Sequence, residues 1–215
     1  DGIHEIVTVN SPASYQAENA AIAYTAALWI ALLSPRPNKE TEQTKTEDMD
    51  LRATIKDALA NSVWEGRFEQ ILPNCYLDGA HNADGIRMLL ASLSPIAAGK
   101  KVTLLFTAVK EKDTDEMIRE LCESGLFCRY LVTTVEGARA IAPEQLKETF
   151  LRYTDAPVIS YTTPKEAFLR GLQDMKVDIE SPATDRAVNT ADSILLCTGS
   201  LYLVGIIKEF LLKKN

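Results

Sequence analysis

The chain has 215 residues, of which 46% are hydrophobic and 25% are charged, and its formal net charge is −7. This composition is ordinary for a globular protein with its own core, and the acidic balance excludes a general nucleic-acid surface, which is normally basic. The length predicts one large domain, or one domain with a fragment of another.

The first third of the chain predicts few elements. "IHEIVTV" alternates β-branched and polar residues and predicts a strand. An Ala-rich helix is expected over 15–33, ended by Pro35, and the polar stretch 34–50 reads as an exposed linker before a short helix that starts at Leu51. A strand and a helix with no core of their own predict that the chain starts inside a domain.

The remainder alternates strands with helices. Two short strands are expected in "WEGRFEQIL" and "CYLDG", and later strands in "KKVTLLFTA", "CRYLVTT", "PVISY" and "SILLCTG". The expected helices are 83–93, 113–123, one opened by Pro143, 164–175 and 200–213. This order predicts an α/β fold with a mostly parallel sheet and helices on both faces.

Polar residues follow several of these strands. In open α/β sheets, ligands bind outside the carboxyl ends of the strands, so these residues mark the expected site. They are Asp78, His81, Asn82, Lys110, Lys112, Asp113, Thr198 and Ser200.

The segment "LDGAHNADG" permits two interpretations. The carboxylate of Asp78 could accept hydrogen bonds from ribose hydroxyls or help to hold a metal, and His81 and Asn82 open a helix whose free N–H groups favour an anion. Alternatively, Asn82 or Asp78 caps the helix and His81 is a surface residue.

Two further segments permit a similar choice. In "TGSLYLVG", the hydroxyl of Ser200 and the backbone N–H groups after Gly199 could hold a carboxylate, or Ser200 could be an N-cap beside a close-packed glycine. In "WEGRFE", Arg67 could pair with a phosphate, or be an exposed arginine of a surface strand.

Several common signatures are missing from the sequence. It has no phosphate-binding P-loop, no G-x-G-x-x-G and no zinc-ligand spacing, and its only histidines are His4 and His81. The cysteines form no C-x-x-C pair, so we expect reduced, buried core thiols at Cys75, Cys122, Cys128 and Cys197. No signal peptide opens the chain, and no apolar run reaches the roughly 18 residues of a membrane span, so we expect a cytoplasmic protein.

Four motifs together carry a family resemblance. From Tyr15 to Lys208 the sequence contains, in order, "YQAENAAIA", "WEGRFE", "LDGAHNADG" and "TGSLYLVG". This series resembles the folylpolyglutamate synthases, which are often bifunctional with dihydrofolate synthase and belong to the Mur-ligase superfamily. The resemblance implies that ATP phosphorylates the carboxylate of a folate or dihydropteroate, and that the amino group of L-glutamate then displaces phosphate from the acyl phosphate.

The resemblance also implies that two domains share the reaction. An N-terminal ATPase domain would carry the P-loop, the Mg²⁺ ligands and most of the folate site, and a Rossmann-like C-terminal domain would close over the nucleotide. We therefore expect 1–33 to be the end of the ATPase domain, 34–62 a linker and 63–215 the C-terminal ligase domain. Without the P-loop, we expect this chain to be inactive alone and to hold no metal. The resemblance suggests a monomer, and no nucleic-acid or membrane partner is expected.

Nucleotide contacts can be carried over motif by motif. The resemblance places Asn19 near the adenine, with Gln16 as a weaker candidate. It implies that Arg67 reaches an ATP phosphate and that Asp78 contacts the ribose or phosphate region.

Glutamate contacts follow from the later motifs. The resemblance assigns His81 and Ser200 to the incoming glutamate, with Asn82 as a further candidate, and Lys112 and Asp113 match a "KD" pair of the family. Two departures bear on these roles. The usual "WPGR" reads "WEGR", which would loosen that turn, and Ala108 replaces the glycine usual before the "KD" segment.

Two alternatives remain beside this reading. One is another amide ligase of the superfamily, such as a peptidoglycan or cyanophycin-type enzyme. The other is a non-catalytic nucleotide-binding or protein-interaction module that has kept the fold without an ATPase partner.

Overall fold

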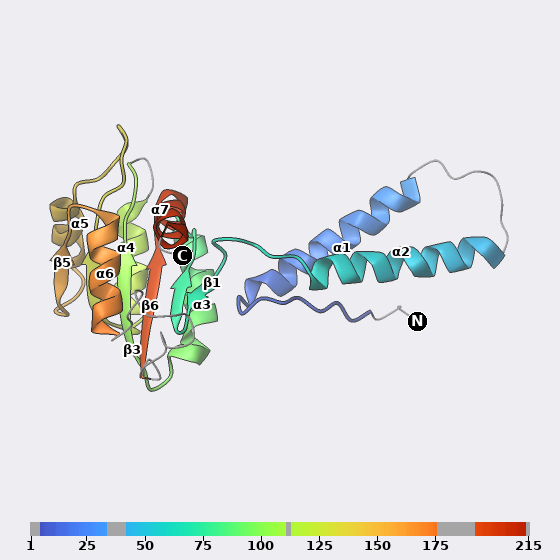
Figure 1. The fold of residues 1–215 in the computed structure, drawn as a ribbon, viewed down its shortest axis with the longest axis horizontal. Helices are drawn as coiled ribbons and strands as arrows, with labels where there is room; N and C mark the ends of the chain where they lie inside the picture. Colours follow the sequence, from blue (N-terminus) through green and yellow to red (C-terminus); the bar gives the residue numbers. More distant parts are fainter. Residues whose placement is uncertain (1–4, 34–41, 111–112, 176–191, 214–215) are drawn as a thin grey trace. The chain divides into compact units, whose positions relative to one another are not determined.

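The computed structural model describes residues 5–33, 42–110, 113–175 and 192–213. The chain divides into two compact units, Asp1–Trp64 and Glu65–Asn215. The first unit is helical and the second contains the sheet (Figure 1). Among the described residues, no helix has both the length and the apolar character needed to cross a membrane.

Two packed helices form most of the first unit: α1 (Tyr15–Leu33) and α2 (Glu42–Ala60). Helix α1 has the predicted bounds. Helix α2 begins at Glu42 rather than at Leu51, so much of the expected linker is helical. The early part of α2, "EQTKTEDMD", lacks an apolar stripe, and a reading based on hydrophobic periodicity therefore misses it.

The predicted N-terminal strand is absent from residues 5–10, which the structure describes without strand pairing. A strand needs a neighbour for its backbone hydrogen bonds, and the described part of this unit offers only helices. Side-chain contacts hold the segment instead. The carboxylate of Glu5 accepts hydrogen bonds from the hydroxyl of Tyr24 and the guanidinium of Arg52, and Nζ of Lys56 lies 2.9 Å from it.

The described residues of the second unit form a six-stranded sheet with the order β1-β2-β6-β3-β4-β5. Its strands are β1 (Glu69–Leu72), β2 (Cys75–Leu77), β3 (Lys101–Phe106), β4 (Phe127–Val132), β5 (Val158–Ser160) and β6 (Ser193–Thr198). Only the β1–β2 pairing is antiparallel among these strands. The predicted mostly parallel α/β fold is therefore confirmed.

Five helices of this unit cover the two faces of the sheet (Figure 1). They are α3 (Ala83–Ala97), α4 (Thr114–Glu123), α5 (Pro143–Phe150), α6 (Pro164–Asp174) and α7 (Leu201–Leu212). Helices α6 and α7 lie on one face and α3, α4 and α5 on the other, so helices cover both faces, as predicted. The central strands β3 and β6 therefore bury both of their sides, which explains their continuous apolar runs in the sequence, whereas β1 at the edge is only partly buried.

Alternate residues along the central strands enter separate cores. Leu105 and Leu195 pack in a cluster with Phe168 of α6. On the opposite face, the rings of Phe106 and Tyr130 contact Phe150 of α5 at centroid distances of 5.5 and 4.9 Å. Burying each such side chain contributes about 1.5–3 kcal/mol to folding, so the two cores fix the sheet on which the site is built.

The cysteines only partly match the prediction. All four are free thiols, and Cys75 and Cys197 are buried, whereas Cys122 is half-buried and Cys128 is exposed. Cys128 lies near the start of β4, where the strand's side chains are not all covered.

Candidate functional site

The turn after β2 begins with a carboxylate that points into the protein. Asp78 is 2% exposed, and its two oxygens accept hydrogen bonds from the backbone N–H groups of Phe68 and Ala80, each at 2.7 Å. Asp78 therefore ties its own turn to the loop that precedes β1. In this conformation its carboxylate is directed to these amides and away from the solvent.

That loop carries Arg67 and is held on both sides of it. The carbonyl of Gly66 accepts a hydrogen bond from the N–H of Gly79 at 2.8 Å, and the N–H of Phe68 donates to Asp78. Gly66 and Phe68 both have a positive φ, of 67° and 51°. The half-buried side chain of Arg67 thus projects from a backbone whose neighbours are fixed.

The glutamate of "WEGR" takes part in an ion-pair cluster. Nζ of Lys208 lies 2.8 Å from carboxylate oxygens of both Glu65 and Glu69, and Glu69 also accepts a hydrogen bond from the N–H of Gly66 at 2.7 Å. A loosened turn was predicted here. In the structure, Lys208 instead tethers this turn. Because the carboxylate of Glu65 is largely exposed, its ion pair with Lys208 adds at most about 1 kcal/mol to stability.

The residues that follow Asp78 have separate tasks. Nδ1 of His81 lies 2.9 Å from the carbonyl oxygen of Gly79. Because that oxygen can only accept, Nδ1 carries the proton in this contact, and Nε2 is the nitrogen left for a ligand. The side chain of Asn82 caps α3 by accepting from the N–H of Gly85 at 2.7 Å, which confirms the capping interpretation for this residue.

The end of β6 is built for close approach. Gly199 has φ of 101°, and a Cβ placed on it would lie 1.9 Å from the carbonyl oxygen of Thr107. Its N–H donates to the carbonyl of Ala80 at 3.0 Å. Ser200 is 4% exposed and caps α7 by accepting from the N–H of Tyr202 at 3.2 Å. Glycine is therefore required where β6 meets the segment after β3.

A cavity of about 240 Å³, here called the rim pocket, lies beside these residues. It brings together His81 and Ser200, as predicted for one site, and adds Arg139 from the loop between β4 and α5. Its lining comprises His81, Val109, Arg139, Gly199, Ser200, Leu201 and Tyr202. Arg139 was not predicted from the sequence. The one feature that could have pointed to it is its place in the loop that follows β4, a strand that ends at the rim.

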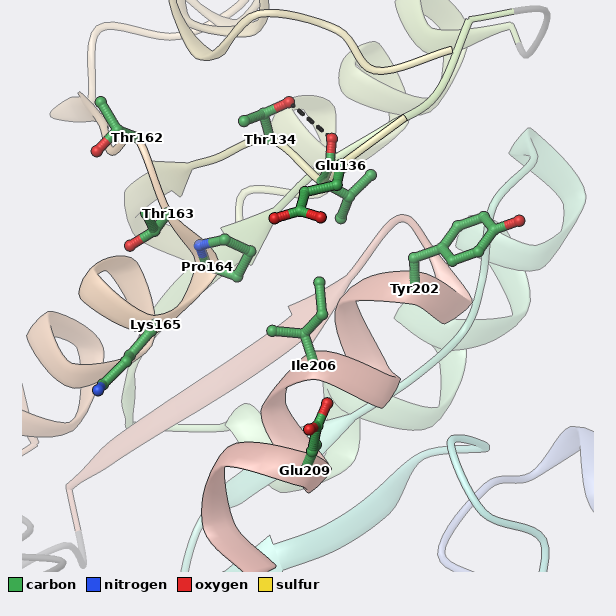
Figure 2. Close-up of a pocket in the computed structure, with 10 residues that line it drawn as sticks. Thr134, Glu136, Thr162, Thr163, Pro164, Lys165, Tyr202, Ile206 and Glu209 are labelled. Atoms are coloured by element: carbon green, nitrogen blue, oxygen red, sulfur yellow. Dashed lines mark hydrogen bonds between the residues drawn. The ribbon is translucent and has the colours of Figure 1, made fainter. Parts of the chain in front are cut away.

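A second cavity of about 610 Å³, here called the outer pocket, shares Tyr202 with the rim pocket. Its walls come from the loop after β4, the start of α6 and one side of α7, as Figure 2 shows. Val135, Pro164 and Ile206 supply apolar surface, and carboxylates of Glu136 and Glu209 are among its polar groups. This pocket could not be predicted from the sequence, because three segments that are distant along the chain form it.

The "KD" pair falls at the edge of what the structure describes. Lys112 lies outside the described residues. Asp113 is exposed and caps α4, accepting from the N–H of Glu116 at 3.1 Å. It lines neither of the two pockets.

The remaining predicted residues belong to the first unit. Nδ2 of Asn19 donates to Oε1 of Gln16 at 3.0 Å near the start of α1. Gln16 is 3% exposed, and its Nε2 has no hydrogen-bond partner among the described residues. A buried amide donor without a partner costs free energy unless a ligand or water completes it. Within the described ranges, no three His, Cys, Asp or Glu side chains gather as metal ligands would.

Comparison with known proteins assigns this architecture to a family. Residues 66–200, which make up most of the second unit, match the family described as "Mur ligase, glutamate ligase domain". The chain therefore belongs to the Mur ligase family and contains its glutamate ligase domain.

Individual relatives show which members of that family this chain is similar to. The chain is 28% identical to the folylpolyglutamate synthase of Lacticaseibacillus casei over 202 residues, which are 92% of this chain and 39% of the relative. It is also 28% identical over 120 residues to the dihydrofolate synthase/folylpolyglutamate synthase of Bacillus subtilis, covering 55% of this chain and 25% of that protein. The predicted resemblance to folylpolyglutamate synthases is confirmed.

Solved structures show the same fold. The bifunctional folylpolyglutamate synthase/dihydrofolate synthase of Yersinia pestis, complexed with AMPPNP and a Mn ion, superimposes with a TM-score of 0.66 at 19% identity. The superposition covers 98% of this chain and 42% of that protein. The chain thus spans about two fifths of that structure's length, and of the Lacticaseibacillus casei relative's.

Proposed function

We propose that this chain supplies the glutamate-binding part of an ATP-dependent ligase that adds L-glutamate to a folate or dihydropteroate. The observation that carries the proposal is the meeting of His81, Ser200 and Arg139 in one pocket at the carboxyl edge of the sheet. The family match and the names of the relatives supply the reaction class.

The rim pocket is suited to hold an amino acid by its negative groups. Ser200 opens α7, so the free N–H groups of that helix and the Ser200 hydroxyl favour an anion at this point. His81 offers Nε2, because its Nδ1 is oriented by Gly79. A glutamate held in this way would direct its neutral amine towards the activated folate carboxylate. The amine would form the amide bond, lose a proton and displace phosphate.

In the second unit, we propose a nucleotide contact at Arg67. The held loop at Arg67 favours an ATP phosphate contact, since a guanidinium on a fixed backbone loses little freedom on binding. We infer that Asp78 acts through this loop, because its carboxylate already accepts two backbone N–H groups.

The amide pair at the start of α1 fits an adenine base. Asn19 orients the amide of Gln16, whose Nε2 is a buried donor still without a partner in the described structure. A ring nitrogen of adenine would be a suitable acceptor for it. When bound, ATP supplies the phosphoryl group that activates the folate carboxylate, and its Mg²⁺ would be held mainly by residues outside this chain.

The relatives support a place for this chain within a longer enzyme. The Lacticaseibacillus casei relative extends well beyond the matched region. On α1, Ile22, Trp29 and Ile30 are each more than 60% exposed, and a preceding ATPase domain would cover such a surface. We accordingly assign 1–33 to the end of that domain, 34–62 to a linker and 63–215 to the ligase domain. The complete enzyme would be a cytoplasmic monomer, and this chain alone would be inactive.

Steady-state kinetics of this chain joined to an upstream P-loop domain tests the proposal. His81→Ala and Ser200→Ala should raise KM for glutamate while KM for ATP stays unchanged, and Arg67→Gln should do the reverse. Thr149→Ala, on α5, is the control because Thr149 lines neither pocket, and it should change neither KM. An active enzyme with normal glutamate KM in both rim-pocket variants would remove these residues from the site.

A further inference from the structure

We propose that the outer pocket is a second ligand site, which binds a flat ring that carries two adjacent N–H donors, as an amidine or an aminopyrimidinone does. Its volume of about 610 Å³ lies within the usual range for small-molecule sites, and the proposed glutamate contacts do not use it. The inference is carried by an apolar floor and by one carboxylate that is directed over it.

The floor of the outer pocket is continuous with the core of the second unit. Val135 is 3% exposed and belongs to the core between the sheet and helices α6 and α7, and Ile206 packs against the same core. Pro164, the first residue of α6, adds a further apolar wall. A ring placed on these side chains would remove apolar surface from water, which favours binding in proportion to the area covered.

Two of the three charged side chains in the described lining already have partners. Nζ of Lys165 lies 4.9 Å from the centroid of the Phe210 ring. The carboxylate of Glu209 lies 2.5 Å from Nζ of Lys213, one turn later in the chain. A ligand would compete with these contacts, so neither group is the main point of recognition.

The third charged group is the carboxylate of Glu136, which forms no hydrogen bond or ion pair with another residue that the structure describes. Figure 2 shows it directed towards the space between Pro164 and Ile206. The two oxygens of a carboxylate accept parallel N–H bonds from donors on adjacent nitrogen atoms, and this paired contact fixes the plane of the ligand. Charge and geometry therefore favour a ring with such a pair of donors.

The start of α6 does not turn the pocket into an anion site. Thr163 caps this helix by accepting from the N–H of Glu166 at 3.3 Å, and Pro164 has no N–H to donate. The described lining also has the carboxylates of Glu136 and Glu209 against a single lysine. An anionic ligand is therefore disfavoured here, and the glutamate of the proposed reaction would stay in the rim pocket.

Two sources could supply the favoured chemistry. One is the pterin of a folate or dihydropteroate, whose amino group and ring N–H form the required pair. The other is a separate small heterocycle that binds without being a substrate. In either case the ring would lie beside the glutamate site, because Tyr202 lines both pockets.

A binding experiment on the whole chain tests the inference. It needs no ATPase domain, so its result is independent of the proposed function. The probe is benzamidine, a ring with two adjacent nitrogen donors, and a ¹⁵N NMR titration locates it. We expect shifts at the amides of Thr134, Glu136 and Ile206. Acetamidine has the same donors without the ring and should bind roughly 10-fold more weakly, because it buries less apolar surface.

Glu136→Gln should raise the Kd of benzamidine roughly 10-fold or more, the loss expected for charge-assisted hydrogen bonds. The side chain is exposed, so the variant should fold normally, which circular dichroism would verify. Glu144→Gln is the matched control. It changes an exposed carboxylate of α5 that lines neither pocket, and it should leave the Kd unchanged.

Competition assigns the occupant. Displacement of benzamidine by dihydropteroate would identify the pterin, and benzamidine that stays bound would identify a separate small ligand; both results support the site. The inference would be overturned if the unmodified chain did not bind benzamidine, if the shifts mapped elsewhere on the chain, or if Glu136→Gln kept the same Kd.

Discussion

At the scale of single residues, the rim depends on a few backbone hydrogen bonds. Asp78 connects two loops through its carboxylate, and Gly199 lets β6 approach the segment after β3. We expect both residues to affect ligand binding without contacting a substrate, because Asp78 positions the loop of Arg67 and Gly199 positions Ser200. Substitutions that separate positioning from ligand contact are therefore informative.

Asp78→Asn should destabilise the second unit by about 1.5–3 kcal/mol, since one of its two amide contacts would then face an NH₂ group instead of a carboxylate oxygen. Urea unfolding followed by circular dichroism measures the change. Asp155→Asn, at an exposed position, should stay within about 0.5 kcal/mol of the unmodified chain. Equal stability of the two variants would show that the Asp78 carboxylate does not hold these loops.

Gly199→Ala should destabilise the second unit by more than about 2 kcal/mol, because its Cβ would overlap a backbone oxygen and its φ of 101° strains any side chain. Gly205→Ala is the matched control. It lies inside α7 with open space around a new Cβ, so it should stabilise the helix by about 0.5–1 kcal/mol. Thermal unfolding of both variants compares them, and a tolerated Gly199→Ala would contradict the close approach described above.

At the scale of elements, one carboxylate fastens the N-terminal segment to both helices of the first unit. The pKa of Glu5 is lowered from 4.5 to about 2, chiefly because Tyr24 donates a hydrogen bond to it, with help from Lys56 and Arg52. A depressed pKa means that the folded state favours the ionised form. The stabilising contribution is therefore complete above about pH 4.5 and is lost as the pH falls towards 2.

The corresponding prediction concerns acid unfolding of the first unit. Glu5→Gln should remove the part of the pH dependence that lies between about pH 4.5 and 2, whereas Glu18→Gln, at an exposed position of α1, should leave it in place. The fluorescence of Trp29 and Trp64 reports on this unit, because the chain has only two tryptophans. An NMR titration that gives Glu5 an ordinary pKa would disprove the contact.

The elements also show how far sequence reasoning reaches. Apolar runs and helix signals predicted the sheet of the second unit and its helices, because both faces of the central strands are buried. The same reasoning placed a strand at residues 3–9, of which 5–9 are described and form no strand, and it missed the early part of α2. The pairing partner of a strand cannot be read from hydrophobic periodicity, and the early part of α2 has no apolar stripe that would reveal a helix.

The site was partly predictable for a related reason. His81 and Ser200 follow strands directly, so the rule for parallel sheets brings them to one edge. Arg139 arrives on a loop whose path depends on the bridge between Val109 and Ala140. The inward direction of the Asp78 side chain likewise depends on the loop at Phe68, which is distant in sequence.

At the scale of the whole molecule, the chain consists of two units with separate packing. The described hydrogen bonds of the rim, from Gly66 to Ser200, all lie within Glu65–Asn215. A fragment that begins at Glu65 should therefore fold alone, with a melting transition within about 2–4 °C of that of the sheet in the full chain. Calorimetry of both proteins measures this, and an unfolded fragment would contradict the division into units.

We propose that this chain provides the glutamate site of a ligase. The most direct measurement joins the chain to a P-loop ATPase domain, supplies ATP, Mg²⁺, L-glutamate and a reduced folate, and follows the folate product by mass spectrometry. We predict a product heavier by one glutamyl residue, formed together with ADP and phosphate and lost when glutamate is omitted. A folded, ATP-hydrolysing protein that leaves the folate unchanged at every glutamate concentration would contradict the claim.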